Sequence, residues 1–343
     1  MRRFKRTLVA AALATTVVAG TTGWASGTAQ QAMTGPPPGT SQWLADTSLG
    51  RPLPDPDRAS PAEVAAFFRG LDEAQRHRLA RRHPGVVGNL DGVPVALRYE
   101  ANALAAARDA RYGHLAGRRL LAFDPRGRGL VAEVFGDLEH SRHVAVVVPG
   151  SDIDAGSYDR ARSPYGTPAG MARQLRAATR GRTAVIAWAG YTTPVGVGPD
   201  AATGGLAEAG AERLARLTGG LVATGAPAPS LFCHSYGSVV CGLAAADVKA
   251  KDLVVFGSPG MRAANVAELG TNARVWAAKA PDDWISRVPH VAFLGLGHGE
   301  DPASDAFGAR RVPADGARGH DGYFAPGTDS LRAFAAIARG EAA

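Results

Sequence analysis

Short apolar runs alternate with amphipathic segments from residue 120 to the C-terminus. Runs of four to six apolar residues are typical of buried strands, and the longer segments between them have helical spacing. Strands that alternate with helices favour a mostly parallel sheet with helices on both faces, the α/β class. The predicted strands are 120–123, 130–135, 143–148, 183–188, 230–233, 253–256 and 274–277, and the predicted helices are 167–178, 206–217, 236–248, 263–269 and 330–338.

A purely helical pattern precedes these strands. Ser60 and Glu63 form a capping box with Pro61 at the first helical position, which predicts a helix start. A second helix is expected over 73–82, ending before Pro84, and a third over 95–116. The sequence Asp-Pro-Arg-Gly at 124–127 is a turn signal, so the first two strands should form an antiparallel hairpin at one edge of the sheet.

The first 29 residues have the pattern of a secretory signal peptide. Basic residues at positions 2–6 precede an uncharged run that is too short to span a membrane, so we expect secretion and no stable membrane anchor. Residues 30–57 are rich in proline and glycine, which predicts an extended linker. The remaining 58–343 should form one large domain, with a helical segment at 58–117 and a core at 118–343.

The charge and the cysteine content of the chain bear on its partners and on its covalent cross-links. The four basic residues of the leader account for four of the formal net charge of +7, which leaves about +3 for the mature chain. Because the mature chain has no basic block with interleaved aromatic residues, no nucleic-acid partner is expected.

Cys233 and Cys241 are eight residues apart, at a strand end and two turns into the next helix. We expect two buried thiols, since that distance exceeds usual disulfide geometry. The oligomeric state cannot be predicted.

The stretch Leu-Phe-Cys-His-Ser-Tyr-Gly-Ser at 231–238 carries the clearest chemical signal. A strand that breaks at a small-x-Ser-x-Gly turn into a helix is a nucleophile elbow, which exposes the hydroxyl of Ser235. The amide of Tyr236 would then face an oxyanion formed on the substrate. Cys233 departs from the motif, which usually has glycine at this position.

A hydrolase that uses this serine needs an acid and a histidine later in the chain. Asp283 follows the strand at 274–277 and precedes a bulky and an aliphatic residue, so it is the preferred acid, with Asp282 second. An alternative is that this pair only caps a turn. His320, just before the last helix, is the preferred base; His298 is its competitor, and His290 lies too close after the acid.

A second oxyanion donor normally follows an early strand. The apolar strand at 143–148 ends in Pro-Gly-Ser, and this places the amide of Ser151 near the expected site. The alternative is an ordinary strand-ending turn. Tyr191 could line an acyl pocket or pack beneath a loop, and 191–205 is expected to form a mobile rim.

Several stretches of the chain resemble an actinobacterial α/β-hydrolase domain family of unknown function. The similarity covers about 58–340, and includes Gly-His-Ser-Tyr-Gly of the family at the nucleophile, matched here by Cys-His-Ser-Tyr-Gly. The segments that carry it are 88–94 (Gly-Asn-Leu-Asp-Gly-Val-Pro), 136–138, 147–151, 187–191 and 319–323. The resemblance implies a serine-hydrolase fold with Ser235, Asp283 and His320 as the triad, and implies no substrate.

These observations lead to two hypotheses. The first is a secreted serine hydrolase that cleaves a small-molecule or lipid ester without any metal or organic cofactor, with amide or peptide cleavage also open. The second is a secreted binding or scaffold protein that keeps the fold without catalysis. The segment 89–92 could be a rigid turn or part of an N-terminal cap over the cleft, and no stretch is apolar enough to predict an interfacial lid.

Overall fold

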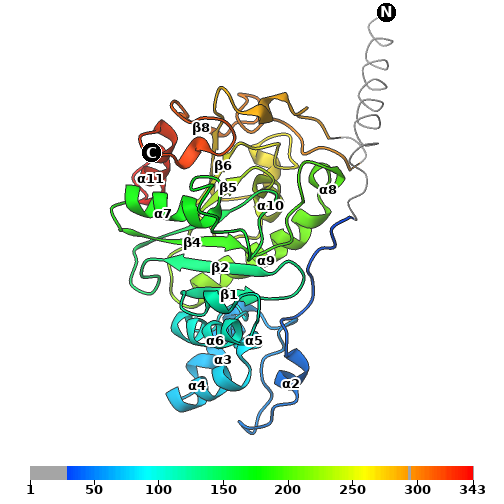
Figure 1. Cartoon of the computed structure of the whole chain (residues 1–343), viewed down its shortest axis with the longest axis vertical. Coiled ribbons are helices and arrows are strands. Elements are labelled where there is room, and N and C mark those ends of the chain that lie inside the picture. The colour runs from blue at the N-terminus through cyan, green and yellow to red at the C-terminus, as the bar shows by residue number, and fades with distance from the viewer. Residues whose placement is uncertain (1–28, 293–294, 343) are drawn as a thin grey trace, which may run out of the picture.

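The computed structural model describes residues 29–292 and 295–342, and its centre is an eight-stranded sheet (Figure 1). The strand order is β1-β2-β4-β3-β5-β6-β7-β8. β2 is antiparallel to both β1 and β4, and all the pairings from β4 to β8 are parallel. The strands are β1 (Leu120–Asp124), β2 (Leu130–Phe135), β3 (His143–Val148), β4 (Thr183–Ala189), β5 (Ser230–His234), β6 (Asp252–Phe256), β7 (Arg274–Ala278) and β8 (Arg310–Val312). The predicted α/β class and the edge hairpin are confirmed.

Helices cover both faces of the sheet, and the alternation along β3 shows why. Val144 and Val146 pack into one hydrophobic core with α9 (Gly205–Ala223) and α10 (Gly237–Ala244). Ala145 and Val147 pack into a second core with α7 (Pro168–Ala178) and α11 (Asp329–Ala338). Successive side chains of a strand point to opposite faces. A strand that is apolar at every position is therefore buried on both sides.

The N-terminal helices form a third core beside β1, below the sheet in Figure 1. They are α3 (Pro61–Arg69), α4 (Glu73–Arg82), α5 (Pro84–Val87) and α6 (Val95–Ala107). The capping box at Ser60 and Glu63 is formed as predicted. α6 is shorter than expected and is followed by a separate 3-10 turn, η1 (Gly113–Leu115).

Residues 30–57 are more than the extended linker expected from their composition. They contain the short helix α2 (Thr40–Leu44), and the fully buried ring of Trp43 packs into the N-terminal core. The indole Nε1 of Trp43 donates a hydrogen bond to the carbonyl oxygen of Pro54 at 2.7 Å. Burial of a large aromatic side chain stabilises by a few kcal/mol, which is enough to order a proline-rich segment around it.

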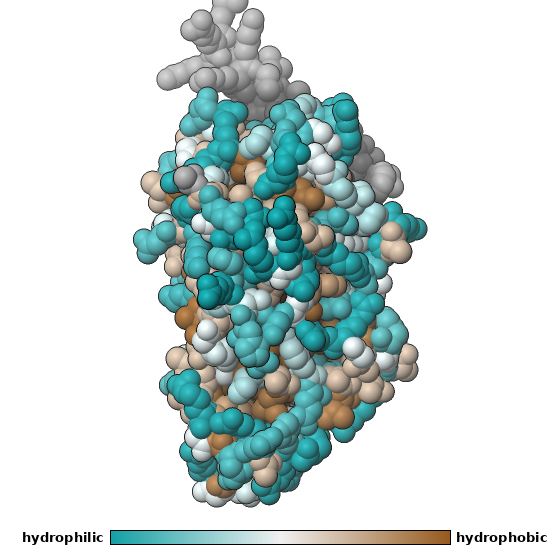
Figure 2. Space-filling model, turned by 90° about the vertical axis from the view of Figure 1, so that its left-hand side faces the viewer, coloured by the Kyte–Doolittle hydropathy of each residue, from teal (hydrophilic) through white to brown (hydrophobic). Residues whose placement is uncertain are grey.

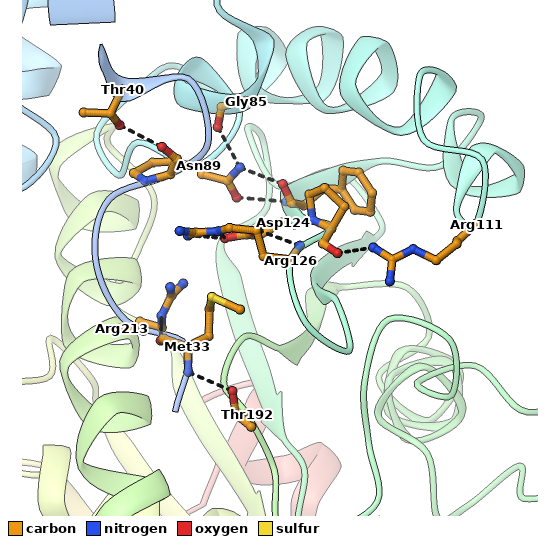
Figure 3. Close-up of polar contacts among 12 residues, drawn as sticks. Met33, Thr40, Gly85, Asn89, Arg111, Asp124, Arg126, Thr192 and Arg213 are labelled. Atoms are coloured by element: carbon orange, nitrogen blue, oxygen red, sulfur yellow. Dashed lines mark hydrogen bonds and ion pairs between the residues drawn. The ribbon is translucent and has the colours of Figure 1, made fainter. Parts of the chain in front are cut away.

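Two asparagines bind the outer edge of β1, and Figure 3 shows the first of them, Asn89. The side chain of Asn89 donates to the carbonyl of Phe123 at 2.7 Å and accepts from the amide of Phe123 at 3.0 Å. Asn102 donates to the carbonyl of Leu120 at 2.9 Å. The segment that includes Asn89 is therefore a structural connection between the N-terminal helices and the sheet.

The start of the described chain crosses α9 and reaches the loop after β4. The amide of Met33 donates to the Thr192 hydroxyl at 2.9 Å, and Arg213 of α9 donates to the Met33 carbonyl at 3.3 Å (Figure 3). These contacts hold residues next to the predicted signal peptide against the folded domain. The predicted signal peptide itself lies almost entirely outside the described residues.

The remaining differences from the predicted elements concern short pieces. The predicted helix at 263–269 is a 3-10 turn, η2 (Val266–Leu269), and the chain also forms η3 (Trp284–Arg287), η4 (Gly322–Phe324) and α8 (Pro199–Ala202). Within the described ranges no helix is both long and apolar enough to cross a membrane. On the face drawn in Figure 2, hydrophilic side chains predominate and apolar atoms lie in small separate groups.

Candidate active site

Ser235 lies at the sharp turn between β5 and α10. Its φ of +53° is in the left-handed region, which is costly for a residue with a side chain and is typical of a nucleophile elbow. Its amide donates to the carbonyl of Phe256 at the end of β6, at 3.1 Å. A side chain at Gly237 would lie 2.5 Å from the carbonyl oxygen of Val148, so glycine lets α10 start directly against β3.

Cys233 and Cys241 form a disulfide, so the prediction of two free thiols is wrong. The turn at Ser235 folds α10 back beside β5, and the Cα atoms of the two cysteines lie only 6.5 Å apart. This distance is within the range that a disulfide spans. Both residues are fully buried, and the bond connects the strand before the serine to the helix after it.

His320 and Asp283 are joined by a hydrogen bond between Nδ1 and Oδ1 at 2.9 Å. The other carboxylate oxygen of Asp283 accepts from the hydroxyl of Tyr323 at 2.7 Å, and the amide of Ile285 donates to Oδ1 at 2.9 Å. Burial alone would raise the pKa of Asp283. The hydrogen bonds from His320, Ile285 and Tyr323 outweigh burial and hold the pKa below its usual value, so the carboxylate is charged near neutral pH.

The structure distinguishes between the two candidate acids. Asp282 is exposed and its Oδ1 accepts a hydrogen bond from the amide of Gly319 at 3.0 Å. It therefore supports the loop that carries His320, whereas Asp283 contacts the imidazole itself. The geometry favours Asp283 as the acid.

Ser235 and His320 line the same cavity, which has a volume of about 320 Å³. Among the described residues no hydrogen bond joins the Oγ of Ser235 to the imidazole, a contact that often tightens only when substrate binds. The indole ring of Trp284 lies beside the imidazole, with 4.6 Å between the ring centroids, and is 39% exposed. The helical segment 58–117 supplies none of the residues that line this cavity, so its interpretation as a cap is unsupported.

Two backbone amides are available to an oxyanion. The amides of Tyr236 and Ser151 donate to no group in the described parts of the chain. Ser151 is next to Gly150, where a side chain would lie 2.6 Å from the Cβ of Ser235, so the loop after β3 approaches the serine closely. Such free amides beside a nucleophile are the donors that an oxyanion hole requires.

Tyr191 packs beneath this loop rather than lining the cavity. Its ring is buried and stacks between Trp188 and Tyr236, and its hydroxyl donates to the carbonyl of Pro149 at 2.7 Å. Of the two uses open to Tyr191, the structure therefore favours packing. The hydrogen bond fixes the backbone two residues before Ser151.

The competing histidines lie elsewhere. His298 is buried against the ring of Tyr236, and its Nε2 donates to the carbonyl of Ala201 at 2.7 Å. His290 is 3.6 Å from the carboxylate of Asp301. Neither lines the cavity that holds Ser235, so the structure favours His320 as the base.

Sequence reasoning missed the contribution of His234, which precedes the serine. Its Nε2 donates to the backbone carbonyl of His320 at 2.9 Å, and its ring lies between Phe256 and the imidazole of His320. Burial, and then the nearby His320, lower the pKa of His234 to about 4, so His234 is neutral near pH 7. A histidine inside an elbow motif, next to the predicted nucleophile, was the only signal for this contact.

Among the described residues no group of three or more His, Cys, Asp or Glu side chains could hold a metal ion.

Residues 124–293 match the family described as "Alpha/beta hydrolase". An uncharacterized protein of Mycobacterium tuberculosis (strain H37Rv) is 30% identical over 84% of this chain. The chain spans 57% of the length of that protein. An uncharacterized protein of Mycobacterium bovis is 32% identical over 49% of this chain and 66% of its own length.

Two solved structures were also found to be similar. The esterase domain of a Rhodothermus marinus protein aligns with 62% of this chain and 91% of its own, at 15% identity and a TM-score of 0.36. A predicted CIB-like hydrolase from Thermoplasma acidophilum aligns with 61% of this chain and 89% of its own, at 13% identity and a TM-score of 0.38.

Proposed function

Because the chain belongs to an α/β-hydrolase family with mycobacterial members, we propose that it is an exported serine hydrolase that cleaves a carboxylic ester. The observation that carries the proposal is one cavity that is lined by a strained serine, a carboxylate-bound histidine and Ser151, whose amide is free. The second free amide, that of Tyr236, directly follows the serine in the chain. Each of these groups has a defined part in acyl transfer.

In the proposed mechanism, His320 accepts the hydroxyl proton of Ser235 as the oxygen attacks the ester carbonyl carbon. Asp283 stabilises the imidazolium and fixes its orientation. The amides of Tyr236 and Ser151 bind the oxyanion of the tetrahedral intermediate. The intermediate collapses to an acyl-enzyme, and the alcohol leaves with the proton from His320. Water, deprotonated by His320, then releases the acid and restores the serine.

Export is part of the proposal, and two observations support it. The predicted signal peptide directs the chain out of the cytoplasm, and the disulfide between Cys233 and Cys241 fits an oxidising compartment. Fusing residues 1–40 to a reporter that is active only outside the cytoplasm tests this. A reporter that stays inactive contradicts the assignment.

A fluorophosphonate probe tests the nucleophile directly, since it reacts covalently with activated serines. We expect labelling of the mature protein and turnover of short-chain 4-nitrophenyl esters, both lost in Ser235→Ala. Ser238→Ala is a matched control, because the Ser238 hydroxyl is buried and donates to the carbonyl of Cys233. Absence of labelling and turnover would favour a binding protein that retains the fold.

Paired variants test the acid and the base. Asp283→Asn should lower kcat by about 10⁴-fold, as loss of a triad acid does, while Asp282→Asn should keep most of the activity. His320→Ala should be inactive, and His298→Ala should retain the fold and turn over substrate. The opposite outcome for either pair would reassign that residue.

A further inference from the structure

The loop that follows Ser151 brings two arginines to the catalytic cavity. Arg160 and Arg162 both line it, and both are exposed. Neither guanidinium has a carboxylate or a hydrogen-bond acceptor within the part of the chain that the structure describes. Their neighbour Asp159 cannot pair with them, since it already binds Arg118, at 2.6 Å, and Arg173.

Two acidic residues also line the cavity. The Oδ1 atom of Asp152 accepts a hydrogen bond from the amide of Gly196 at 2.9 Å. The Oδ1 atom of Asp321 lies 3.9 Å from the Nε2 of His234, which donates its proton to the carbonyl of His320 instead. Neither carboxylate binds Arg160 or Arg162, so both guanidinium groups are available to an anion that enters the cavity.

Apolar surface at the cavity is limited. Trp284 and Val197 are the lining residues with large exposed apolar side chains, and they are 39% and 72% exposed. The cavity volume of about 320 Å³ is at the lower end of small-molecule sites. This combination fits a short substrate with one charged end better than a long acyl chain.

Resting on the proposed esterase function, we propose that the preferred substrate is an ester that carries a carboxylate, which Arg160 and Arg162 bind. The planar guanidinium fork matches the two oxygens of a carboxylate. The carboxylate can belong to the acyl part or to the alcohol part of the ester, and the test separates these two sources.

The acyl part is tested with mono-4-nitrophenyl glutarate against 4-nitrophenyl pentanoate. These esters have the same acyl length and leaving group and differ in the terminal carboxylate. The alcohol part is tested with 4-acetoxybenzoate against 4-acetoxybenzamide. For each pair we compare kcat/KM of the charged ester with kcat/KM of the neutral ester. For at least one pair we expect this ratio to be about fivefold lower in Arg160→Gln and in Arg162→Gln than in the wild type. A fivefold change corresponds to the free energy of one exposed charge pair.

The change should lie mainly in KM, and 0.5 M salt should reduce the wild-type ratio, because exposed charges are screened. Arg142→Gln is the control, since it removes the same charge from an exposed arginine just before β3, at the other end of that strand from Ser151. Its ratio should equal that of the wild type.

The outcomes separate the two proposals. Equal ratios in the wild type and all three variants, with both substrate pairs hydrolysed, overturn carboxylate recognition and leave the esterase function standing. A wild type that hydrolyses none of the four esters and takes no fluorophosphonate overturns the esterase function, and carboxylate recognition falls with it.

Discussion

Loss of the disulfide between Cys233 and Cys241 should destabilise the protein by an amount that can be calculated. The bond closes a loop across a sequence separation of 8 residues. In the chain-entropy treatment, a loop of this length lowers the entropy of the unfolded chain by about 8 cal/mol/K, or about 2.5 kcal/mol at 25 °C. This is a large share of the stability of a typical domain.

Catalysis should suffer less than stability. β5 is paired with β3 on one side and β6 on the other, and Cys233 is in register with both strands. These pairings hold the strand before Ser235 without the cross-link. We expect kcat of the reduced, folded protein to fall by less than about tenfold, or 1.4 kcal/mol.

Equilibrium urea unfolding, followed by tryptophan fluorescence, measures the effect. Wild-type protein refolded in a reductant loses only the cross-link, while the double variant Cys233→Ala/Cys241→Ala also loses the packing of two buried sulfur atoms. The reduced wild type should unfold with about 2.5 kcal/mol less free energy, and the double variant with still less. If the oxidised and reduced proteins unfold at the same urea concentration, the reasoning is refuted.

Three further predictions concern single side chains. Tyr191→Phe removes the hydrogen bond to the carbonyl of Pro149, which fixes the loop that carries Ser151, so kcat should fall about fivefold. Tyr99→Phe removes a buried hydroxyl without a partner in the described chain and should not lower kcat. The folded-state pKa of His234, about 4, lies below its ordinary value of 6.5, so the unfolded chain binds more protons between these pH values. The free energy of unfolding should therefore fall by about 2 kcal/mol from pH 7.5 to pH 5. The variant His234→Asn should not show this fall. The control variant His114→Gln, at an exposed site, should show it in full. Trp284→Ala should raise KM for 4-nitrophenyl pentanoate several-fold and change the urea midpoint little, because the ring is 39% exposed; an unchanged KM would exclude substrate contact.

The parts of this fold that depend on apolar periodicity could be predicted from the sequence. Seven strands could be predicted because each is a predominantly apolar run, and β8 was missed because two of its three residues are exposed arginines. The helix α2 was missed because one buried tryptophan, Trp43, orders a segment whose composition otherwise indicates a linker.

In the candidate site, too, some features could be predicted from the sequence and others could not. Chain order was enough to place Asp283 and His320 at the ends of neighbouring elements, and the structure brings them together. The disulfide was not predicted because the spacing of the two cysteines does not show that the turn at Ser235 folds α10 back beside β5. The contact of His234 depends on where a distant loop lies, which no local pattern encodes.

The two edges of the sheet also have a consequence for how copies of the protein meet one another. At one edge, Asn89 and Asn102 already occupy backbone groups of β1 that another strand would need. At the other, β8 has three residues, two of them exposed arginines. Free, flat edges are templates for strand pairing between chains, whereas short, charged or occupied edges resist it. The native protein should therefore stay free of edge-to-edge aggregation at high concentration, and Asn89→Ala should increase its tendency to aggregate.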